Sequence, residues 1–205
     1  MSPDVLIALV TFCTASTVTP GPNNMMLLSS GATFGFRHTI PHMLGISMGC
    51  VVMVLLLGFG LSGLIARAPW LYTVLHIVST GYLLYLSWRI ATSAGVGVGV
   101  GAERARPLRF IDAAAFQWVN PKAWAMTLGA TTSFARPDHL TVDVSLVALV
   151  LAAFGLPCIA LWAGGGTVIR RLLGRPGALR AFNIGMAALL VASLLPGLIE
   201  LARRV

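Results

Sequence analysis

The chain has 205 residues, of which 57% are hydrophobic and only 10% are charged, against about 25% charged residues in an ordinary soluble domain. So few charges cannot form a water-facing shell, and this excludes a typical soluble globule. The net charge of +8 resides in short connectors between apolar runs, as the positive-inside bias predicts, and not on one basic face as in a nucleic-acid-binding domain. We therefore expect a protein in a lipid bilayer, with no nucleic-acid partner.

The first apolar run covers residues 4–18, and Asp4 stands where a cleaved signal peptide would carry a basic residue. We therefore expect a retained first span. The run resumes after Asn24 and continues to about residue 36. An unbroken helix over 4–34 would be about 46 Å long, well beyond a hydrocarbon core of about 30 Å. The first segment must therefore be broken or strongly tilted.

Five further apolar segments follow. The second covers about 43–65 and the third about 70–90, each close to the length of about 20 residues needed to cross a bilayer. Residues 93–109 alternate glycine with valine and then become basic, so we interpret them as a flexible linker. The fourth covers about 110–134 and is interrupted at Asn120, Pro121 and Lys122. The fifth covers about 142–169 and contains Pro157, and the sixth covers about 178–201.

The six segments form two groups of three, residues 1–92 and 110–205, within a single transmembrane domain that covers 1–205. Each group opens with a segment broken at proline, Pro22 in the first and Pro121 in the second. Because three is odd, the second group enters the membrane from the opposite side, which predicts an inverted repeat. The segment lengths exclude barrel strands. The expected fold is an all-α membrane protein with six transmembrane helices as two inverted three-helix repeats.

Counting basic residues in alternate connectors predicts the orientation. The first, third and fifth connectors hold nine: Arg37, Arg89, Arg104, Arg106, Arg109, Arg170, Arg171, Arg175 and Arg180. The other side holds four: Arg67, Arg136, Arg203 and Arg204. The positive-inside rule then places the odd connectors in the cytoplasm and both termini outside.

The two proline breaks are the strongest candidates for a binding site. A proline inside a helix costs about 3 kcal/mol, and in lipid the freed backbone groups are tolerated where they line a cavity or are buried in protein. Gly21 can cap a helix restarting at Pro22, and Asn120 one restarting at Pro121. The restarted helices offer amides to a carboxylate, and the unwound carbonyls suit an ammonium or a coupling cation. The alternative is that both prolines only kink helices for packing.

Lys122 is the one basic residue deep within an apolar segment, where an ammonium costs about 2.5–3.5 kcal/mol on insertion scales. It also opposes the macrodipole of the helix that it begins. An anionic partner would explain it, either a substrate carboxylate or Asp112; the alternatives are that Lys122 snorkels to the interface or pairs permanently with Asp112. Asp112 is in turn a candidate for proton coupling, or only marks the interfacial start of its segment.

The remaining polar and small residues receive structural interpretations. His42 and His76 lie in or beside apolar spans, where a histidine could relay protons, but a lone intramembrane histidine is more often a hydrogen-bonded packing residue, so they are assigned no role. Asp4, Asp143 and Glu200 fall near segment ends and are expected at the interfaces. The spacing of Gly45 with Gly49, and of Gly31 with Gly35, permits close helix packing within the chain or a homodimer contact.

Several chemical functions have no motif in this sequence. Cys13, Cys50 and Cys158 are isolated in apolar runs, which supports neither a disulfide nor a zinc site. The alternating glycines of 95–101 lack the spacing of a dinucleotide or phosphate loop. We find no nucleophile elbow, metalloprotease motif or paired carboxylates. We therefore expect no metal, no cofactor and no enzyme activity.

With Pro20, Gly21, Pro22 and Asn23 in the first segment and Asn120, Pro121 and Lys122 in the fourth, the chain resembles the LysE/RhtB family of amino-acid exporters. The tract from Tyr82 to Trp88 is similar to the third span of that family, and the resemblance covers nearly the whole chain. It implies a six-span transporter in the bacterial cytoplasmic membrane that exports amino acids or close relatives, driven by the proton-motive force.

The sequence therefore predicts a secondary transporter that works by alternating access between the two inverted units. The substrate is expected to be a small neutral amino acid of the threonine, homoserine, leucine or cysteine kind, because no acid falls convincingly at the bilayer centre. A passive channel or a non-transporting membrane scaffold is the first alternative, and an intramembrane enzyme is the second. The expected substrate-binding residues are Pro20, Gly21, Pro22, Asn23, Asn24, Asn120, Pro121 and Lys122.

Overall fold

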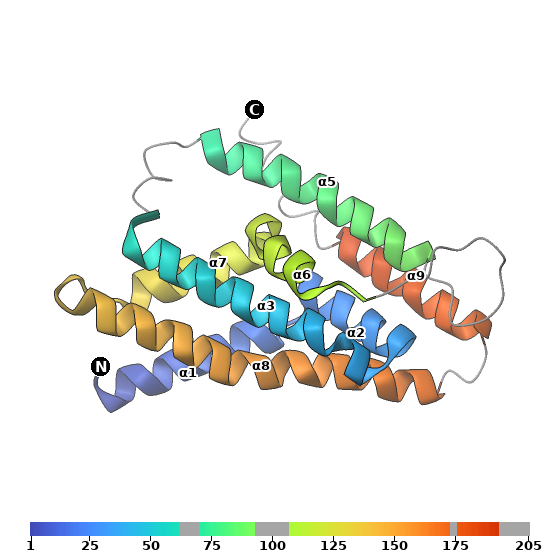
Figure 1. Ribbon diagram of the computed structural model, residues 1–205, viewed down its shortest axis with the longest axis horizontal. Helices are drawn as coiled ribbons and strands as arrows, with labels where there is room; N and C mark the ends of the chain where they lie inside the picture. The colour runs from blue at the N-terminus through green and yellow to red at the C-terminus, as the bar shows by residue number, and fades with distance from the viewer. Residues whose placement is uncertain (62–69, 93–106, 173–175, 193–205) are drawn as a thin grey trace.

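The computed structural model describes residues 1–61, 70–92, 107–172 and 176–192. All regular elements in these ranges are helices, which pack lengthwise into an elongated bundle (Figure 1). The predicted all-α class is thus confirmed. The linker at 93–106 and the end of the predicted sixth segment at 193–201 lie outside the described residues, as does the side chain of His76.

The first apolar segment is two helices, α1 (Pro3–Val18) and α2 (Pro22–Phe34), bent by 57° at the break between them. Pro20 and Pro22 supply no amide hydrogens there, and Gly21 between them is fully extended, at φ −176° and ψ 179°. The expected interruption is confirmed, with Gly21 as the N-cap of α2.

The helix α3 (Phe36–Leu56) follows α2 after a single residue, Gly35, which adopts φ +86°. A residue with a side chain rarely takes that conformation. The predicted start of the second apolar segment near residue 43 was wrong, because α3 begins at Phe36. Pro41 lies in its second turn. It continues into the π-helical turn η1 (Leu57–Leu61).

The fourth apolar segment is interrupted as well. After α5 (Trp70–Thr92), the fourth segment consists of α6 (Phe110–Phe116), the 3₁₀ turn η2 (Gln117–Val119) and α7 (Pro121–Phe134). Its predicted break is confirmed, and the Asn120 side chain caps α7. The turn η3 (Pro137–His139) leads into α8 (Leu140–Leu172), which contains Pro157 without ending there, and α9 (Pro176–Ala192) follows.

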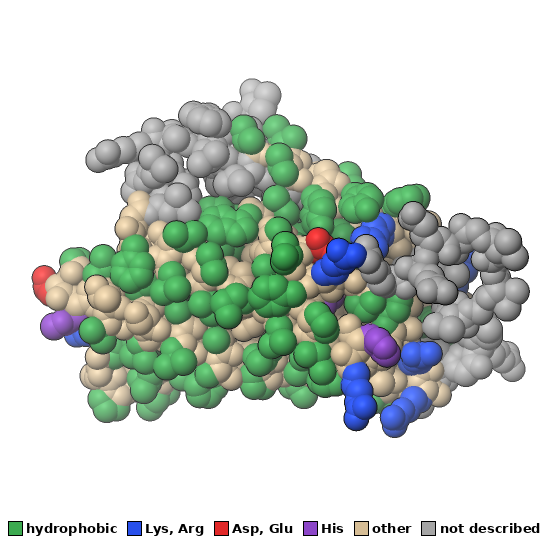
Figure 2. All heavy atoms as spheres, viewed as in Figure 1, with side chains coloured by type: hydrophobic (Ala, Val, Ile, Leu, Met, Phe, Trp, Pro, Cys, Tyr) green, Lys and Arg blue, Asp and Glu red, His purple; other side chains and the backbone are tan. Residues whose placement is uncertain are grey.

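Two stretches, Phe36–Gly60 and Pro137–Arg171, are long and apolar enough to cross a membrane, and the bent pair α1 and α2 makes a third if it counts as one span. Large apolar side chains face outward along them; Met48 is 50% exposed and Leu149 64%. Figure 2 shows this apolar surface along the bundle, with basic side chains gathered at the end where α3 begins and α8 ends. The exterior is that of a membrane protein.

Glycines allow close helix contacts within the bundle. A Cβ on Gly31 of α2 would overlap the carbonyl of Ala163 on α8, and one on Gly45 or Gly49 of α3 would overlap the backbone of α6. These three glycines serve packing within the chain, as expected. Gly35 does not share that role, because it forms the turn between α2 and α3.

The three cysteine thiols and the carboxylate of Asp143 are buried in the bundle. The thiols of Cys13, Cys50 and Cys158 are free and buried, as predicted. Asp143 lies near the start of α8, yet its carboxylate is 0% exposed, where we expected an interfacial residue. Arg136 donates to it from Nε at 2.7 Å and from Nη2 at 3.1 Å, which forms a two-pronged ion pair at the turn between α7 and α8.

The glycine contacts predict an effect on stability. Gly31→Ala should destabilise the protein by about 1–3 kcal/mol, because its Cβ would meet backbone that cannot move aside. Gly185→Ala on α9 is the matched control, since nothing lies within 4 Å of a Cβ there. Thermal unfolding in detergent should show a lower midpoint for Gly31→Ala alone, by about 2–4 °C for each kcal/mol. Equal midpoints for the two variants would contradict the close contact of α2 with α8.

Candidate functional site

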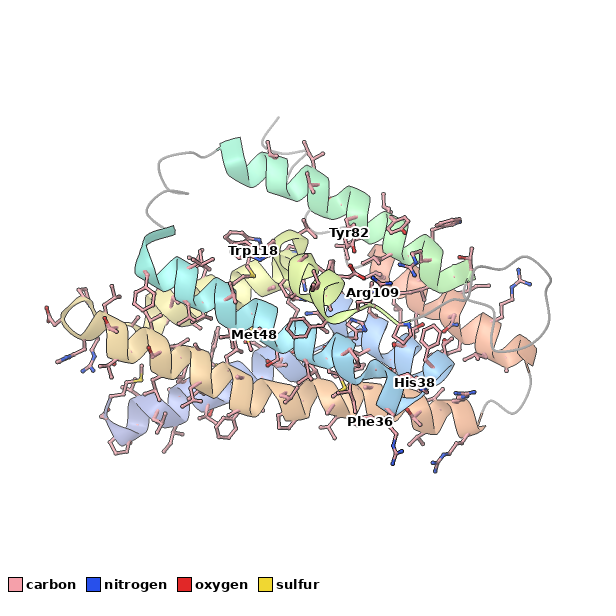
Figure 3. All side chains as sticks on the ribbon, in the orientation of Figure 1. Phe36, His38, Met48, Tyr82, Arg109 and Trp118 are labelled. Carbon is pink, nitrogen blue, oxygen red and sulfur yellow. The ribbon has the colours of Figure 1, made fainter. Side chains whose placement is uncertain are left out.

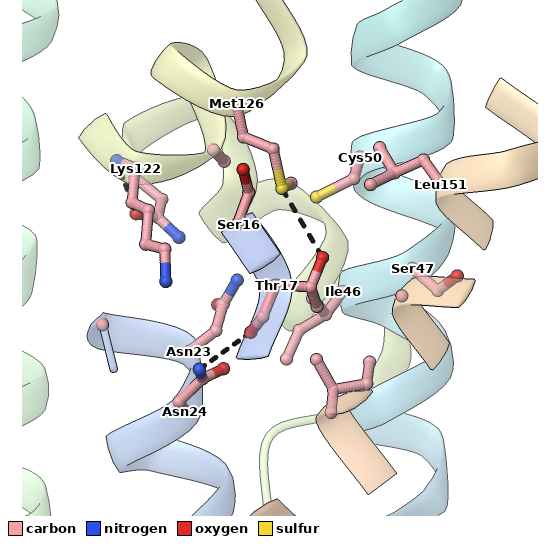
Figure 4. A pocket seen from close by; sticks show the side chains of 15 residues that line it. Ser16, Thr17, Asn23, Asn24, Ile46, Ser47, Cys50, Lys122, Met126 and Leu151 are labelled. Carbon is pink, nitrogen blue, oxygen red and sulfur yellow. Dashed lines mark hydrogen bonds between the residues drawn. The ribbon is translucent and has the colours of Figure 1, made fainter. Parts of the chain in front are cut away.

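The two helix breaks face the same cavity. Its lining includes Gly21, Asn23 and Asn24 from the first break and Asn120 and Lys122 from the second. Other lining residues come from α1, α3, α7 and α8, and the empty space is about 480 Å³, part of it open to solvent (Figure 4). The structure thus brings together five of the eight residues predicted from the sequence; Pro20, Pro22 and Pro121 lie in the adjoining backbone.

Lys122 joins the two breaks directly. Its side chain reaches from α7 to the break after α1, where Nζ donates to the carbonyl oxygens of Thr19 and, at 3.4 Å, Pro20. These carbonyls belong to the unwound turn, so the ammonium satisfies acceptors that no backbone amide there can reach. A Cβ on Gly21 would lie 2.6 Å from Cδ of Lys122. Glycine at this position therefore leaves room for the lysine stem.

The pairing of Lys122 with Asp112, one of the alternatives considered from the sequence, is not formed. Asp112 is exposed on α6 and does not line the cavity. The ion pair found within the described ranges joins Arg136 to Asp143. The protein partners of Lys122 are instead the backbone carbonyls of the first break.

Asn24 closes the end of α1 from the other side. Its Nδ2 donates to the carbonyl of Thr17 at 3.0 Å and to that of Thr19 at 2.7 Å, and the residue is only 3% exposed. The Thr19 carbonyl therefore receives both the Asn24 amide and the Lys122 ammonium. A side chain in the first turn of α2 thus acts as the C-terminal cap of α1.

Asn23 and Gln117 form a second link between the breaks. Asn23 donates to Oε1 of Gln117 at 2.8 Å, and Gln117 returns a bond to Oδ1 of Asn23 at 3.2 Å. Gln117, which is 0% exposed, also donates to the Ala113 carbonyl and accepts from Asn120. Sequence reasoning missed Gln117. Its signal was available, because it is the single glutamine of the chain and lies inside an apolar segment three residues before Asn120.

Asn120 completes the second break. Its Oδ1 accepts from the backbone amide of Lys122 at 3.1 Å, as an N-cap does, while its Nδ2 faces Gln117 at 3.4 Å. The cap therefore ties the start of α7 to the amide pair that bridges the two breaks.

Beyond the breaks, the cavity wall is mostly apolar. Ile46, Leu151 and Ile159 contribute hydrocarbon, and Thr17 lies beside Met126 with Oγ1 to Sδ at 3.7 Å (Figure 4). Sequence reasoning did not select these residues, because nothing in an apolar run marks which of its faces lines a cavity. Lys122 is the charged residue in the lining. The lining therefore presents one cation and several side-chain amides, and the carbonyls of the first break are paired with Lys122 and Asn24.

No group of three His, Cys, Asp or Glu side chains gathers within the described residues. The cavity chemistry is that of hydrogen bonding to a polar solute.

An apolar helical bundle with a polar cavity at two facing helix breaks has the features of a membrane transport protein. The LysE type translocator family matches residues 14–193. The chain belongs to this family, and it is accordingly a transporter and not an enzyme.

Curated relatives agree with that assignment. The cysteine/O-acetylserine efflux proteins of Escherichia coli (strain K12) and Shigella sonnei (strain Ss046) are each 34% identical over 196 residues, which cover 93% of this chain and 96% of the relative. The protein of the same name from Salmonella typhi is 32% identical over 195 residues, with the same coverage. No solved structure matches this chain.

The amide bridge predicts that Gln117 is important for stability. Gln117→Met keeps the side-chain volume but leaves the Asn23 amide without this partner, and we expect a loss of about 1–3 kcal/mol. Ser47→Ala is the control in the same lining, since no side-chain hydrogen bond of Ser47 is seen within the described residues. A thermal unfolding midpoint of Gln117→Met at or above that of Ser47→Ala would contradict a stabilising bridge.

Proposed function

We propose that this protein exports small neutral amino acids across the bacterial cytoplasmic membrane by proton-coupled alternating access. The observation that carries the proposal is the meeting of two broken helices at one cavity, with Lys122 reaching from one break to the other. Discontinuous helices that meet at a polar site are a common way for secondary transporters to bind a solute within the bilayer. The efflux function named for the curated relatives supports the direction of transport.

The contacts of Lys122 suggest how a zwitterion binds. In the structure, the Lys122 ammonium occupies the carbonyls of Thr19 and Pro20, which are the acceptors that the α-ammonium of an amino acid needs. We propose that the substrate ammonium replaces Lys122 there, while the freed Lys122 turns to the substrate carboxylate. One cation exchanges for another at the same carbonyls, so the acceptors remain satisfied in both states.

The lining also suggests the size and charge of the substrate. No carboxylate lines the cavity, so a second positive charge on the solute would have no partner among these residues. The wall formed by Ile46, Leu151 and Ile159 suits a short side chain with little charge. Cysteine and O-acetylserine, which the relatives are named for exporting, meet these requirements, and we propose this substrate class.

The helix contacts support two inverted units. If segments one, two and three correspond to four, five and six, each contact between units should have a counterpart. Segment one (α1, α2) packs on segment five (α8), and segment four (α6, α7) packs on segment two (α3). Segment three (α5) packs on segment six (α9). Exchange of the two units turns this contact into itself. Such pairwise matching is what a two-fold relation would produce, and we propose six spans on this basis.

The charge distribution supports the orientation. Six arginines of the described residues lie at or near an end of their helix: Arg37 (α3), Arg89 (α5), Arg109 (α6), Arg170 and Arg171 (α8) and Arg180 (α9). Figure 2 shows basic side chains gathered at the end of the bundle where α3 begins and α8 ends. Arg136 lies at the opposite end and is neutralised by Asp143. We propose that the arginine-rich end is cytoplasmic, which leaves both termini outside. A proton-coupling role for Asp112 and a homodimer remain predictions.

Lys122→Ala should abolish transport, because the substrate carboxylate would lose its cation. Counterflow of labelled cysteine in proteoliposomes is the assay, and the initial rate should fall at least about tenfold, which corresponds to 1.4 kcal/mol or more. Thermal unfolding of the variant should remain cooperative. Normal flux and affinity in Lys122→Ala would remove this residue from the site, and absence of counterflow in the wild type would overturn the proposed function.

Asn24→Ala should weaken substrate binding, because the Thr17 and Thr19 carbonyls would lose a donor that fixes their direction. We expect a rise of about 3- to 30-fold in the half-saturation concentration, with a smaller change in maximal rate. Ser87→Ala is the comparison variant, since Ser87 is similarly buried but lies on α5, outside the cavity lining. An unchanged half-saturation for Asn24→Ala would count against its place in the site.

A further inference from the structure

His42 is a buried polar side chain that the contacts described above leave unexplained. It lies in α3, is 1% exposed, and neither Nδ1 nor Nε2 has a hydrogen-bond partner. In the part of the chain that the structure describes, every other buried side-chain nitrogen or oxygen atom has a hydrogen-bond partner. The expectation that this histidine would be hydrogen-bonded in packing is therefore wrong. An apolar residue would fill the same space without unpaired nitrogens.

The neighbours of His42 along α3 show which way it points. Gly45, three residues later, faces the start of α6, and Thr39, three residues earlier, accepts or donates a bond with Ser30 of α2 at 3.0 Å. The helical repeat places His42 between these two directions, in the seam of α2, α3 and α6. Ile46, one turn further on, lines the cavity. His42 is thus about 6 Å along the helix from the cavity wall, toward the arginine-rich end.

A polar cluster continues from His42 to that end of the bundle. Besides the bond between Ser30 and Thr39, Asn183 of α9 accepts from Ser29 at 3.0 Å and donates to Thr33 at 3.2 Å, and all five residues are buried. These bonds join α2 to α3 and to α9. Ser, Thr and Asn side chains that hydrogen-bond across helices hold the helices of a membrane bundle together. His42 therefore lies between the cavity and a hydrogen-bonded closure.

The seam around His42 offers nothing to stabilise a positive imidazolium. The charged groups on the helices that pack against α3 are Arg109 and Asp112 on α6, Lys122 on α7, and Asp143, Arg170 and Arg171 on α8. None of them hydrogen-bonds to either ring nitrogen. Asp143 is held by Arg136 at the other end of α8, and Asp112 is exposed. In the closed seam the ring nitrogens therefore meet no hydrogen-bond acceptor, and α2 and α3 would have to separate to bring one to them.

We propose that His42 is the proton-binding group that couples export to the proton gradient. The imidazole takes one proton when the seam is open to the outer side and releases it when the seam opens to the cytoplasm, while one zwitterion leaves the cell per cycle. Protonation is linked to conformation because the charged ring is more stable when the seam is open than when it is closed. This inference rests on the proposed function, and it assigns to His42 the role for which Asp112 was the candidate.

His42→Gln tests the assignment, with His38→Gln as the matched control. His38 lies in the first turn of the same helix and is exposed (Figure 3). Two measurements in proteoliposomes separate coupling from binding: counterflow of labelled cysteine without a pH gradient, and net uptake of cysteine against its gradient when an opposing pH gradient is imposed. Counterflow requires no net proton movement. For His42→Gln we expect gradient-driven accumulation to fall at least tenfold with counterflow within about threefold of wild type; His38→Gln should retain both.

Other outcomes would overturn the proposal. Gradient-driven accumulation that survives in His42→Gln, or is lost only in Asp112→Asn, excludes His42 as the coupling group. Loss of both activities in a folded His42→Gln shows a structural role instead. His42→Met guards against misfolding, because it removes the unpaired nitrogens; its unfolding midpoint should equal or exceed that of wild type, and its transport should be uncoupled in the same way. Absence of counterflow in wild type would instead refute the proposed export function.

Discussion

Backbone carbonyls that lack an amide partner within lipid are the constraint on which this structure depends. The break after α1 leaves such oxygens at Thr19 and Pro20, because the prolines that follow supply no donors. The chain satisfies them with side chains from both halves: the Asn24 amide from α2 and the Lys122 ammonium from α7. The need for donors at one break thus fixes the position of the other, and the cavity forms where the two meet.

The same arrangement explains why the two motifs occur together. A lysine at the start of a helix opposes the local dipole, and a Pro-Gly-Pro turn inside a bilayer exposes unpaired carbonyls. Each is unfavourable alone, and each compensates the other when they face across a few ångströms. Gly21 belongs to this arrangement because a side chain there would displace the lysine stem. Asn23 and Gln117 add a neutral bridge beside the charged one.

Much of this could be predicted from the sequence, because the determinants are local. The positions of the prolines predicted both breaks, and the asparagine directly before Pro121 predicted the cap of α7. The lengths of the apolar runs predicted the helical class. What failed depended on three-dimensional neighbours. The start of α3 was misplaced by about two turns. The protein partner proposed for Lys122 was Asp112, whereas the structure pairs Lys122 with backbone carbonyls. The partner of Gln117 and the lack of one for His42 depend on which helices pack together, which the sequence does not show.

The single-residue turn at Gly35 has a mechanical consequence. With one linking residue, the last turn of α2 and the first turn of α3 must move together, so the separation at His42 proposed above takes place as a hinge opening about Gly35. The opposite end of α2 adjoins the cavity at Asn23 and Asn24. A solute that shifts the beginning of α2 would therefore also move the first turn of α3. Binding in the cavity would in this way affect the end of the bundle where α3 begins.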